Sequence, residues 1–289
     1  MCNDCGCGTP SEKPPKISIP GMAHHAHHHP HSHDHPHSHG HDHEHPHTHD
    51  HDHSHAPADA TAGANRRQLQ VGRAILDQND RLAERNRGYF RARNLFVLNV
   101  VSSPGSGKTA FLRETLIRLK GRLRAGVIVG DLATENDGLR LRESGAPVVQ
   151  ITTGTVCHLD AGMIGRAVAE LPSRDLDLLI IENVGNLVCP SSYDLGEDLR
   201  VVLLSVTEGE DKPLKYPPIF QSAGAVVVSK MDLAGPCAFD RSTALKNISL
   251  SAPRATVFEV SSRTGLGMEG WISYLEEQHR AARSTPPLG

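Results

Sequence analysis

Short runs of apolar residues alternate with longer amphipathic stretches over most of the chain. Seven of these runs predict strands, at 95–101, 125–131, 147–152, 176–183, 200–206, 224–230 and 255–260. Within each run the apolar residues follow one another closely, which is typical of strands buried on both faces of a parallel sheet. Helices are predicted between most of the strands, near 109–123, 138–144, 159–170, 239–249 and 268–282. The alternation predicts an α/β fold with a doubly wound, mostly parallel sheet and with ligands at the carboxyl ends of the strands.

The first 64 residues lack this pattern. They divide into a Cys-rich head and linker (1–21), a His-rich tract (22–55) and a segment predicted as a flexible linker (56–64). Because they are rich in His, Pro, Asp and Gly, they have little apolar surface to offset the entropy of ordering, and we expect a disordered extension. The folded domain is predicted over 65–289, beginning with a polar surface helix from Arg66 to about Tyr89.

Composition narrows the class of protein. The formal net charge of −3 over 289 residues argues against a nucleic-acid partner. No apolar run reaches the 18 residues of a membrane span, and the N-terminus "MCNDCGCGTP" has no apolar core of a signal peptide. We therefore expect a cytoplasmic chain with no membrane partner. In that compartment clustered cysteines indicate metal or redox chemistry rather than structural disulfides.

A phosphate-binding loop is predicted at 102–109, "SSPGSGKT". It follows the usual pattern G-x-x-x-x-G-K-[ST], except that Ser102 replaces the first glycine. A strand before the loop and a helix after it allow backbone N–H groups to surround β- and γ-phosphate oxygens. Lys108 would add positive charge and the Thr109 hydroxyl would ligate Mg²⁺. Phosphate binding alone leaves kinase, ATPase and GTPase open. The residues predicted to bind nucleotide here are Pro104, Gly105, Ser106, Gly107, Lys108, Thr109 and Ala110.

Two later segments are candidates for binding the base of the nucleotide. "VVVSKMD" (226–232) ends in S-K-x-D, whereas GTPases use N-K-x-D, whose Asp accepts from guanine N1 and N2. Asp232 and Lys230 fit the Asp and Lys roles, and Ser229 replaces the Asn, which leaves guanine selectivity open. "VSSRTG" (260–265) resembles the loop whose N–H meets guanine O6, so Ser261 and Ser262 are predicted to bind nucleotide. An ordinary Lys–Asp pair at a strand end is the alternative interpretation.

Carboxylates at two strand ends are candidates for magnesium and catalysis. "IIENVGN" (180–186) gives E-x-x-G where GTPases usually have D-x-x-G, so Glu182 would orient the Mg²⁺ shell and Gly185 would sense the γ-phosphate. Asp131 would hold a Mg²⁺-bound water or orient the attacking water, and Asp137 is equally well a solvated loop carboxylate. Catalysis would come mainly from positioning and charge neutralisation. The predicted catalytic residues are Lys108, Asp131 and Glu182, and the predicted magnesium ligands are Thr109, Asp131 and Glu182.

Soft metal ligands occur in three places. Cys157 and His158 adjoin at a predicted strand-to-helix junction, and Cys189 follows Glu182 by seven residues. Thiolates with imidazole suit Ni²⁺ or Zn²⁺, although a single cysteine is more often a small core residue. Cys237 has no evident partner. The head "CNDCGC" forms a compact thiolate chelate with Cys2, Cys5 and Cys7, or alternatively a reactive, disulfide-prone segment.

The His-rich tract holds 18 of the 20 histidines, interleaved with Asp, Ser and Pro, unlike the pure His run of a purification tag. Flexible imidazoles suit several divalent ions with modest individual affinity. Mild acid would make the tract cationic, because imidazole titrates near pH 6.5. The predicted storage ligands are His24, His25, His27, His28, His29, His31, His33, His35, His37, His39, His41, His43, His45, His47, His49, His51, His53 and His55.

Taken in order, "CNDCGC", the His tract, "SSPGSGKT", "GDLATENDGLRL", "CHLDA", "IIENVGNLVCP", "VTEGEDKPLKYP" and S-K-M-D closely resemble the HypB family. The resemblance covers residues 66–282 and the N-terminal head. It implies a slow GTPase of the SIMIBI class, using GTP, GDP and Mg²⁺, that supports nickel insertion into [NiFe]-hydrogenase. It implies a nickel or zinc site at Cys157, His158 and Cys189 and a second at Cys2, Cys5 and Cys7. It also places Lys212 against the nucleotide or a dimer mate.

The resemblance further implies partners. These are a second copy of the chain, in a nucleotide- and metal-dependent homodimer, a HypA-type nickel chaperone and the hydrogenase large-subunit precursor. Alternatives remain at this stage. They are a urease-type nickel GTPase, a metal storage protein with weak nucleotide turnover, and a P-loop kinase, although no Arg-rich lid is apparent.

Overall fold

The computed structural model describes residues 15–21, 58–172 and 175–284. The chain divides into two compact units, one of Met1–Gly21 with Ile75–Gly289 and the other of Met22–Ala74. Helix α1 (Ala58–Ala92) passes from the second unit into the first. None of the helices in the described ranges combines the length and hydropathy that a membrane crossing requires.

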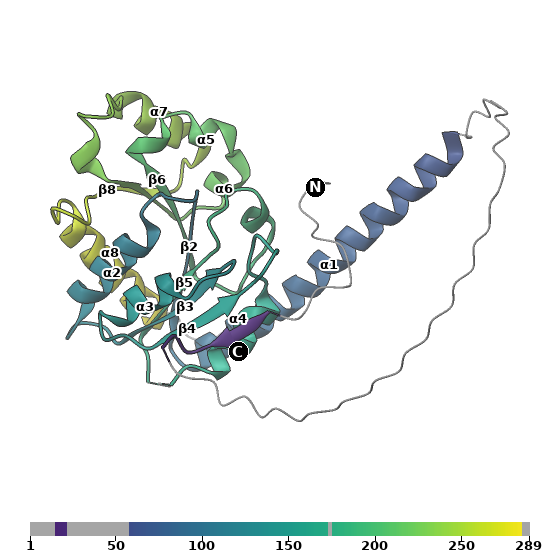
Figure 1. Cartoon of the computed structure of the whole chain (residues 1–289), viewed down its shortest axis with the longest axis horizontal. Helices are drawn as coiled ribbons and strands as arrows, with labels where there is room; N and C mark the ends of the chain where they lie inside the picture. Colours follow the sequence, from purple (N-terminus) through teal and green to yellow (C-terminus); the bar gives the residue numbers. More distant parts are fainter. Residues whose placement is uncertain (1–14, 22–57, 173–174, 285–289) are drawn as a thin grey trace, which may run out of the picture. The chain divides into compact units, whose positions relative to one another are not determined.

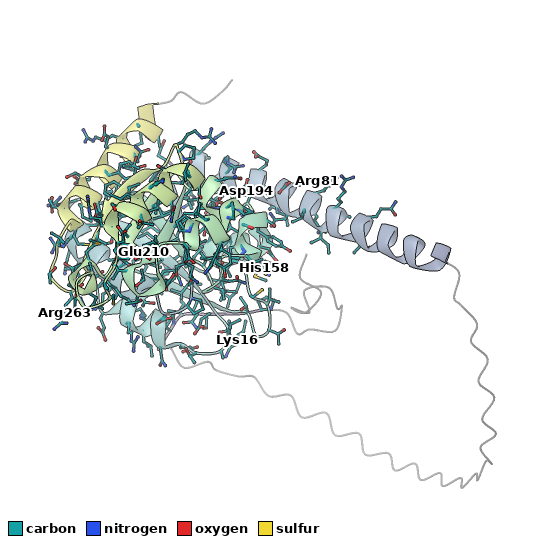
Figure 2. The ribbon with its side chains drawn as sticks, turned by 90° about the horizontal axis from the view of Figure 1, so that it is seen from above. Lys16, Arg81, His158, Asp194, Glu210 and Arg263 are labelled. Atoms are coloured by element: carbon teal, nitrogen blue, oxygen red, sulfur yellow. The ribbon has the colours of Figure 1, made fainter. Side chains whose placement is uncertain are left out.

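One sheet organises the first unit. In the described ranges its strand order is β1-β4-β3-β5-β2-β6-β7-β8, and every pair is parallel except β1 with β4. The predicted doubly wound, mostly parallel sheet is confirmed (Figure 1). The strands are β1 (Lys16–Ser18), β2 (Phe96–Ser102), β3 (Ala125–Asp131), β4 (Val148–Thr152), β5 (Leu178–Glu182), β6 (Leu199–Ser205), β7 (Ala225–Ser229) and β8 (Thr256–Glu259).

Helices cover both faces of the sheet (Figure 1). Successive residues of β2 point to opposite faces, so Leu98 packs with Phe111 and Trp271, whereas Val97 packs with Ile164. A third apolar cluster lies between β6, β7 and the helices beside them. The remaining helices are α2 (Lys108–Leu119), α3 (Asn136–Arg142), α4 (Ala161–Ala169), α5 (Lys212–Lys215), α6 (Pro217–Gln221), α7 (Arg241–Ser251) and α8 (Met268–Ser284), with 3₁₀ turns η1 (Cys189–Ser192), η2 (Val206–Glu208) and η3 (Met231–Leu233).

The predicted strands lie within two residues of the observed ones, but β8 differs in burial. Thr256 and Val257 are exposed, because β8 is the last strand of the sheet and only one neighbour covers it. The short helices α5 and α6 were not predicted. Each contains only about one turn. The prolines at their starts are also common in loops, so the sequence did not indicate a helix.

Two expectations about the N-terminal extension are wrong in part. The linker predicted at 56–64 is helical from Ala58 onward, and four alanines in "ADATAGA" explain this, since alanine has the highest helix propensity. The linker predicted within 1–21 contains strand β1, where "KISI" alternates polar and apolar residues and Ile17 packs against the core beside β4. Residues 1–14 and 22–57 lie outside the described residues.

Candidate nucleotide and metal site

The phosphate loop joins the end of β2 to the start of α2. Gly105 and Gly107 have φ of 74° and 90°, a region that residues with a Cβ rarely adopt. A Cβ on Gly107 would also lie 3.3 Å from Cε of Lys230. Helix α2 begins at Lys108, directly after Gly107, and its first amides face the loop. The segment therefore has the backbone shape that phosphate binding requires.

Ser102 stands where the usual pattern has its first glycine, and it is fully buried. Its hydroxyl accepts hydrogen bonds from Ser106 Oγ at 2.6 Å and Lys108 Nζ at 3.3 Å, and donates to Ser103 O at 2.8 Å. A hydroxyl has one proton and two lone pairs, so these contacts satisfy it. Ser102 therefore orients the Lys108 ammonium along the loop, a role that glycine could not fill.

Thr109 and Glu182 meet at the start of α2 and the end of β5. Thr109 Oγ1 donates to Glu182 Oε1 at 2.8 Å, and Glu182 Oε2 is buried without a hydrogen-bond partner among the described residues. Burial raises the pKa of Glu182 to about 7, opposed by Lys108 and by the Thr109 hydroxyl. A buried carboxylate oxygen with no donor beside a hydroxyl is a pair of oxygen ligands of the kind Mg²⁺ prefers. The residues present therefore fit the predicted magnesium site.

Gly185 lies against the phosphate loop. A Cβ on Gly185 would come within 3.1 Å of the main-chain Cα of Pro104, closer than the backbone can accommodate without moving. The E-x-x-G segment and the phosphate loop are thus in direct contact. A movement of either backbone segment must therefore displace the other.

Asp131 ends β3, and its carboxylate is engaged by its own loop. It accepts from Leu132 N at 2.7 Å, Thr134 N at 3.1 Å and Thr134 Oγ1 at 2.7 Å. The negative charges of Asp131 and Asp137 both contribute to the raised pKa of Glu182. In this state Asp131 holds the 131–134 turn, and its predicted contact with a water or magnesium stays a prediction.

The S-K-x-D and V-S-S-R-T-G segments, which were predicted to bind the base, converge on the phosphate loop. Ser229 Oγ donates to Ser106 O at 2.9 Å, and Lys230 Nζ donates to Gly105 O at 2.7 Å. Ser261 Oγ donates to Asp232 Oδ1 at 2.6 Å and is fully buried. The S-K-x-D and V-S-S-R-T-G segments are therefore fixed to each other and to the loop. Of the two predicted serines, Ser261 orients the carboxylate directly, and Ser262 is partly exposed beside it.

Glu208 is a further candidate site residue, which sequence reasoning did not single out. Burial raises its pKa, opposed by Ser103 and by the positive charges of Lys212, Lys230 and Lys108. Lys212 also lies over the ring of Tyr216, 5.3 Å from its centroid. The signal was present in "VTEGEDKPLKYP", where an acid precedes a lysine-rich stretch, but only Lys212 was assigned from it.

The segment after β4 and the segment after β5 bring three candidate metal ligands together. The ligand atoms of Cys157, His158 and Cys189 all lie within 4.8 Å of one another, with 2.9 Å between the two sulfurs. His158 is buried and stacks on Tyr193 at 3.9 Å between ring centroids, and its Nδ1 has no partner among the described residues. Burial lowers the pKa of His158, which favours the neutral ring that binds metals. Two sulfurs and one nitrogen suit Ni²⁺ or Zn²⁺.

Asn186 links this triad to the nucleotide segment. Its Nδ2 donates to Cys157 O at 3.4 Å, and its Oδ1 accepts from Val188 N at 2.8 Å, one residue before Cys189. Asn186 follows Gly185 directly, so one side chain joins the loops of both cysteines to the segment that contacts the phosphate loop. The other predicted metal ligands, Cys2, Cys5, Cys7 and the histidines of the tract, lie outside the described residues.

Comparison with known proteins assigns the family. Residues 96–259 match the family described as CobW/HypB/UreG, nucleotide-binding domain. The chain is 50% identical over 218 residues to the hydrogenase maturation factor HypB of Escherichia coli K12, which covers 75% of each chain. The chain belongs to the HypB family. The resemblance that the sequence motifs predicted is confirmed.

Other HypB proteins extend the comparison. The hydrogenase/urease maturation factor HypB of Helicobacter pylori 26695 is 42% identical over 220 residues, 75% of this chain and 90% of that one. A HypB structure from Helicobacter pylori in complex with nickel has a TM-score of 0.68, covering 73% of this chain and all of that one at 42% identity. HypB from Archaeoglobus fulgidus has a TM-score of 0.66, 40% identity and coverage of 70% and 99%.

Proposed function

We propose that this protein is a GTP-hydrolysing nickel metallochaperone that supports nickel insertion into the [NiFe]-hydrogenase large subunit. The observation that carries the proposal is the Asn186 linkage. It connects a Cys157–His158–Cys189 triad to the E-x-x-G segment that packs on the phosphate loop. A storage protein would need the ligands but not their connection to a nucleotide site.

Nucleotide hydrolysis would rest on positioning and charge. Lys108, held by Ser102, would neutralise charge that develops on the β- and γ-phosphate oxygens. Thr109 and Glu182 would hold Mg²⁺, which when bound neutralises phosphate charge. Gly185 would donate its N–H to the γ-phosphate, and Asp131 would orient the attacking water after leaving its turn. Because Asp131 must first give up the hydrogen bonds of that turn, intrinsic turnover would be slow.

Guanine selection would rest on Asp232. Its carboxylate, oriented by Ser261, would accept from guanine N1 and N2, and Lys230 would pack along the ring. The hydroxyl of Ser229 would keep this segment hydrogen-bonded to the phosphate loop. GTP and GDP are therefore the proposed nucleotides.

Nickel is the proposed cargo, and Zn²⁺ is a competitor for the same sulfur and nitrogen ligands. The Cys157–His158–Cys189 triad leaves at least one coordination position for a ligand from another molecule. A second copy of the chain, a HypA-type chaperone and the hydrogenase large-subunit precursor are the proposed partners. The relative named for both hydrogenase and urease makes a urease accessory role the second candidate.

The test is GTP turnover of the full chain with nickel titrated in, compared with Lys108→Ala. We expect slow turnover that nickel alters and that falls on the order of 10²-fold in the variant, because the phosphate charge is no longer neutralised. A matched control is Lys120→Ala, which removes an exposed lysine at the other end of α2. Turnover that is absent from the native chain would favour storage, and turnover unchanged in Lys108→Ala would contradict the site.

A further inference from the structure

Residues 16–21, the β1 segment, form one edge of the sheet. Strand β1 pairs antiparallel with β4, with Ser18 opposite Gln150 (Figure 1). The pairing covers only three residues, and β4 is the sole neighbour of β1 among the described strands. Residues 22–57 separate β1 from α1 along the chain, so β1 can leave β4 without breaking the pairing of any other strand. Short edge elements of this kind open at a lower free energy than the centre of a sheet.

The segment that follows β3 lies beside the nucleotide site. It covers residues 131–138 and carries two carboxylates, Asp131 and Asp137. Both act electrostatically on the buried Glu182, which accepts a hydrogen bond from Thr109 at the start of α2. A movement of this segment therefore changes the charges around the predicted magnesium site.

The β1 segment contacts this same stretch of chain. Ser18 is only 4% exposed, and its Oγ donates to Glu135 Oε1 at 3.1 Å. Pro20 is buried and packs on Gly138, where an added Cβ would lie 2.6 Å from Pro20 Cγ. Residues 131–138 thus have the nucleotide site and the β1 segment as neighbours.

Gln150 restrains the stretch from β4. It is fully buried, and its Nε2 donates to the main-chain oxygen of Thr134, within the turn that holds the Asp131 carboxylate. Its Oε1 is buried and has no hydrogen-bond partner among the described residues. An unpaired buried acceptor is unfavourable, so the restrained arrangement carries a cost that opening would relieve.

We propose that the β1 segment is an autoinhibitory contact, which holds the turn at 131–135 and slows GTP hydrolysis for as long as β1 is paired with β4. This rests on the proposed function, in which Asp131 leaves its turn to orient the attacking water. Asp131 cannot do so while its carboxylate accepts the three hydrogen bonds of that turn. Ser18 and Gln150 hold the two residues at the end of the turn and thereby oppose its opening. They are positioning residues, since they act through Asp131.

Ser18→Ala tests the contact in the full-length chain. It removes the bond to Glu135, and we expect the single-turnover rate of GTP hydrolysis to rise by roughly three- to tenfold, because a buried bond to a carboxylate is lost. The Kd for GDP should not change, because the phosphate loop is untouched. Ser18→Thr keeps the hydroxyl and should retain the native rate. A rate in Ser18→Ala equal to or below that of the native chain would overturn the proposal.

A second variant removes the same bond from its other side. Glu135→Ala lies at the surface end of the contact and should raise the rate by a similar factor, with no further increase in the double variant Ser18→Ala/Glu135→Ala. The matched control is Ser144→Ala, which removes a bond to Leu141 O at the far end of α3 and should leave the rate unchanged. Rate increases that simply multiply in the double variant would contradict a shared contact. Thermal unfolding checks that each variant is folded.

Hydrogen exchange tests the contact without any turnover. The amides of Leu132 and Thr134 donate to the Asp131 carboxylate, so their exchange reports opening of the turn. With GDP bound, we expect exchange roughly three- to tenfold faster in Ser18→Ala than in the native chain. Equal exchange in the two chains would overturn the proposal. Faster exchange in chains that hydrolyse no GTP would contradict the proposed function and leave the contact in place.

Discussion

The hydroxyl of Ser229 donates a hydrogen bond to the main-chain carbonyl of Ser106, 2.9 Å away in the phosphate loop. Ser229 stands where GTPases usually have asparagine. Ser229 and Ser106 are both buried. The shorter side chain therefore still ties the S-K-x-D segment to the phosphate loop. The next residue, Lys230, has a positive φ of 59° and donates from Nζ to Gly105 O at 2.7 Å, which gives a second contact with the same loop.

Removing this bond should weaken guanine nucleotide binding. In Ser229→Ala the buried carbonyl of Ser106 loses its donor, which costs about 1–2 kcal/mol, or roughly a 5- to 30-fold higher Kd for GDP. Ser229→Asn restores a donor and should recover most of the affinity. Ser249→Ala, which removes a similar bond to Lys246 O on exposed α7, is the matched control and should leave the Kd unchanged. An unaltered Kd in Ser229→Ala would remove this role.

Asp232 should set the preference among bases. A carboxylate accepts from guanine N1 and N2, whereas xanthine carries an oxygen at position 2, so Asp232→Asn should bind xanthine nucleotides better relative to guanine. Ser261→Ala keeps the carboxylate but frees it, and should weaken guanine binding with no shift toward xanthine. Competition binding with GDP and XDP measures the base preference and the guanine affinity of both variants. A ratio that is the same in Asp232→Asn and native protein would show that the base is read elsewhere.

The His tract should hold nickel independently of nucleotide turnover. Replacing its eighteen histidines by serine keeps the chain length between β1 and α1, which a deletion of 22–55 would not. Nickel capacity, measured by equilibrium dialysis, should fall steeply, whereas GTP turnover should not change. In the native chain, capacity should also fall as pH drops below about 6.5, because only the neutral imidazole binds metal. A large loss of turnover would show that the tract acts on the nucleotide site.

Asp177 should stabilise the fold in a pH-dependent way. Hydrogen bonds from the Arg124 side chain and main chain lower the pKa of Asp177 to about 2. Since the unfolded value is near 3.9, this contribution is full above about pH 4 and is lost as pH falls toward 2. Arg124 is 62% exposed, so we expect only about 1 kcal/mol.

Urea unfolding of Asp177→Asn tests this. The variant should be less stable at pH 7, and about half of the difference should remain at pH 3. Asp175→Asn is the matched control, because Asp175 is exposed nearby and should show no such difference. A difference that grows as pH falls would contradict the assignment.

Most of the fold followed from local pattern. Buried parallel strands are continuous apolar runs, so β2 to β7 could be located within two residues. The nucleotide site could also be predicted from local sequence. The backbone shape of a phosphate loop requires glycine at particular positions, and the motifs follow one another in a recognisable order. Pairing between distant segments left weaker signals. Strand β1 has three residues, and its partner lies more than 130 residues later, so only "KISI" could have indicated it.

Side-chain geometry was the other limit. The motifs suggested Cys157, His158 and Cys189 but not the stacking of His158 on Tyr193, because ring packing depends on how two loops meet. Likewise, nothing in "GDLATEND" indicated that Asp131 would accept three bonds from its own turn. Glu208 was missed because Lys108 and Lys230 come near it only when β6 is paired with both β2 and β7.

Asn186 should be the residue through which metal and nucleotide affect each other. It bonds the loops of both cysteines and follows the glycine that touches the phosphate loop. A γ-phosphate that draws Gly185 inward would move the thiolates, and reciprocity requires nickel to change nucleotide affinity by the same factor. Asn186→Ala should therefore reduce the coupling while each ligand still binds alone.

The most direct measurement is nickel titration of the chain with its His tract replaced by serine, once with GDP and once with a non-hydrolysable GTP analogue. Cysteine protection at Cys157 and Cys189 separates this centre from the head. We predict nickel affinities that differ by about fivefold or more between the two nucleotides, a difference that Cys189→Ala abolishes while nucleotide binding persists. Equal nickel affinities with both nucleotides would contradict the account and leave the triad a structural metal site.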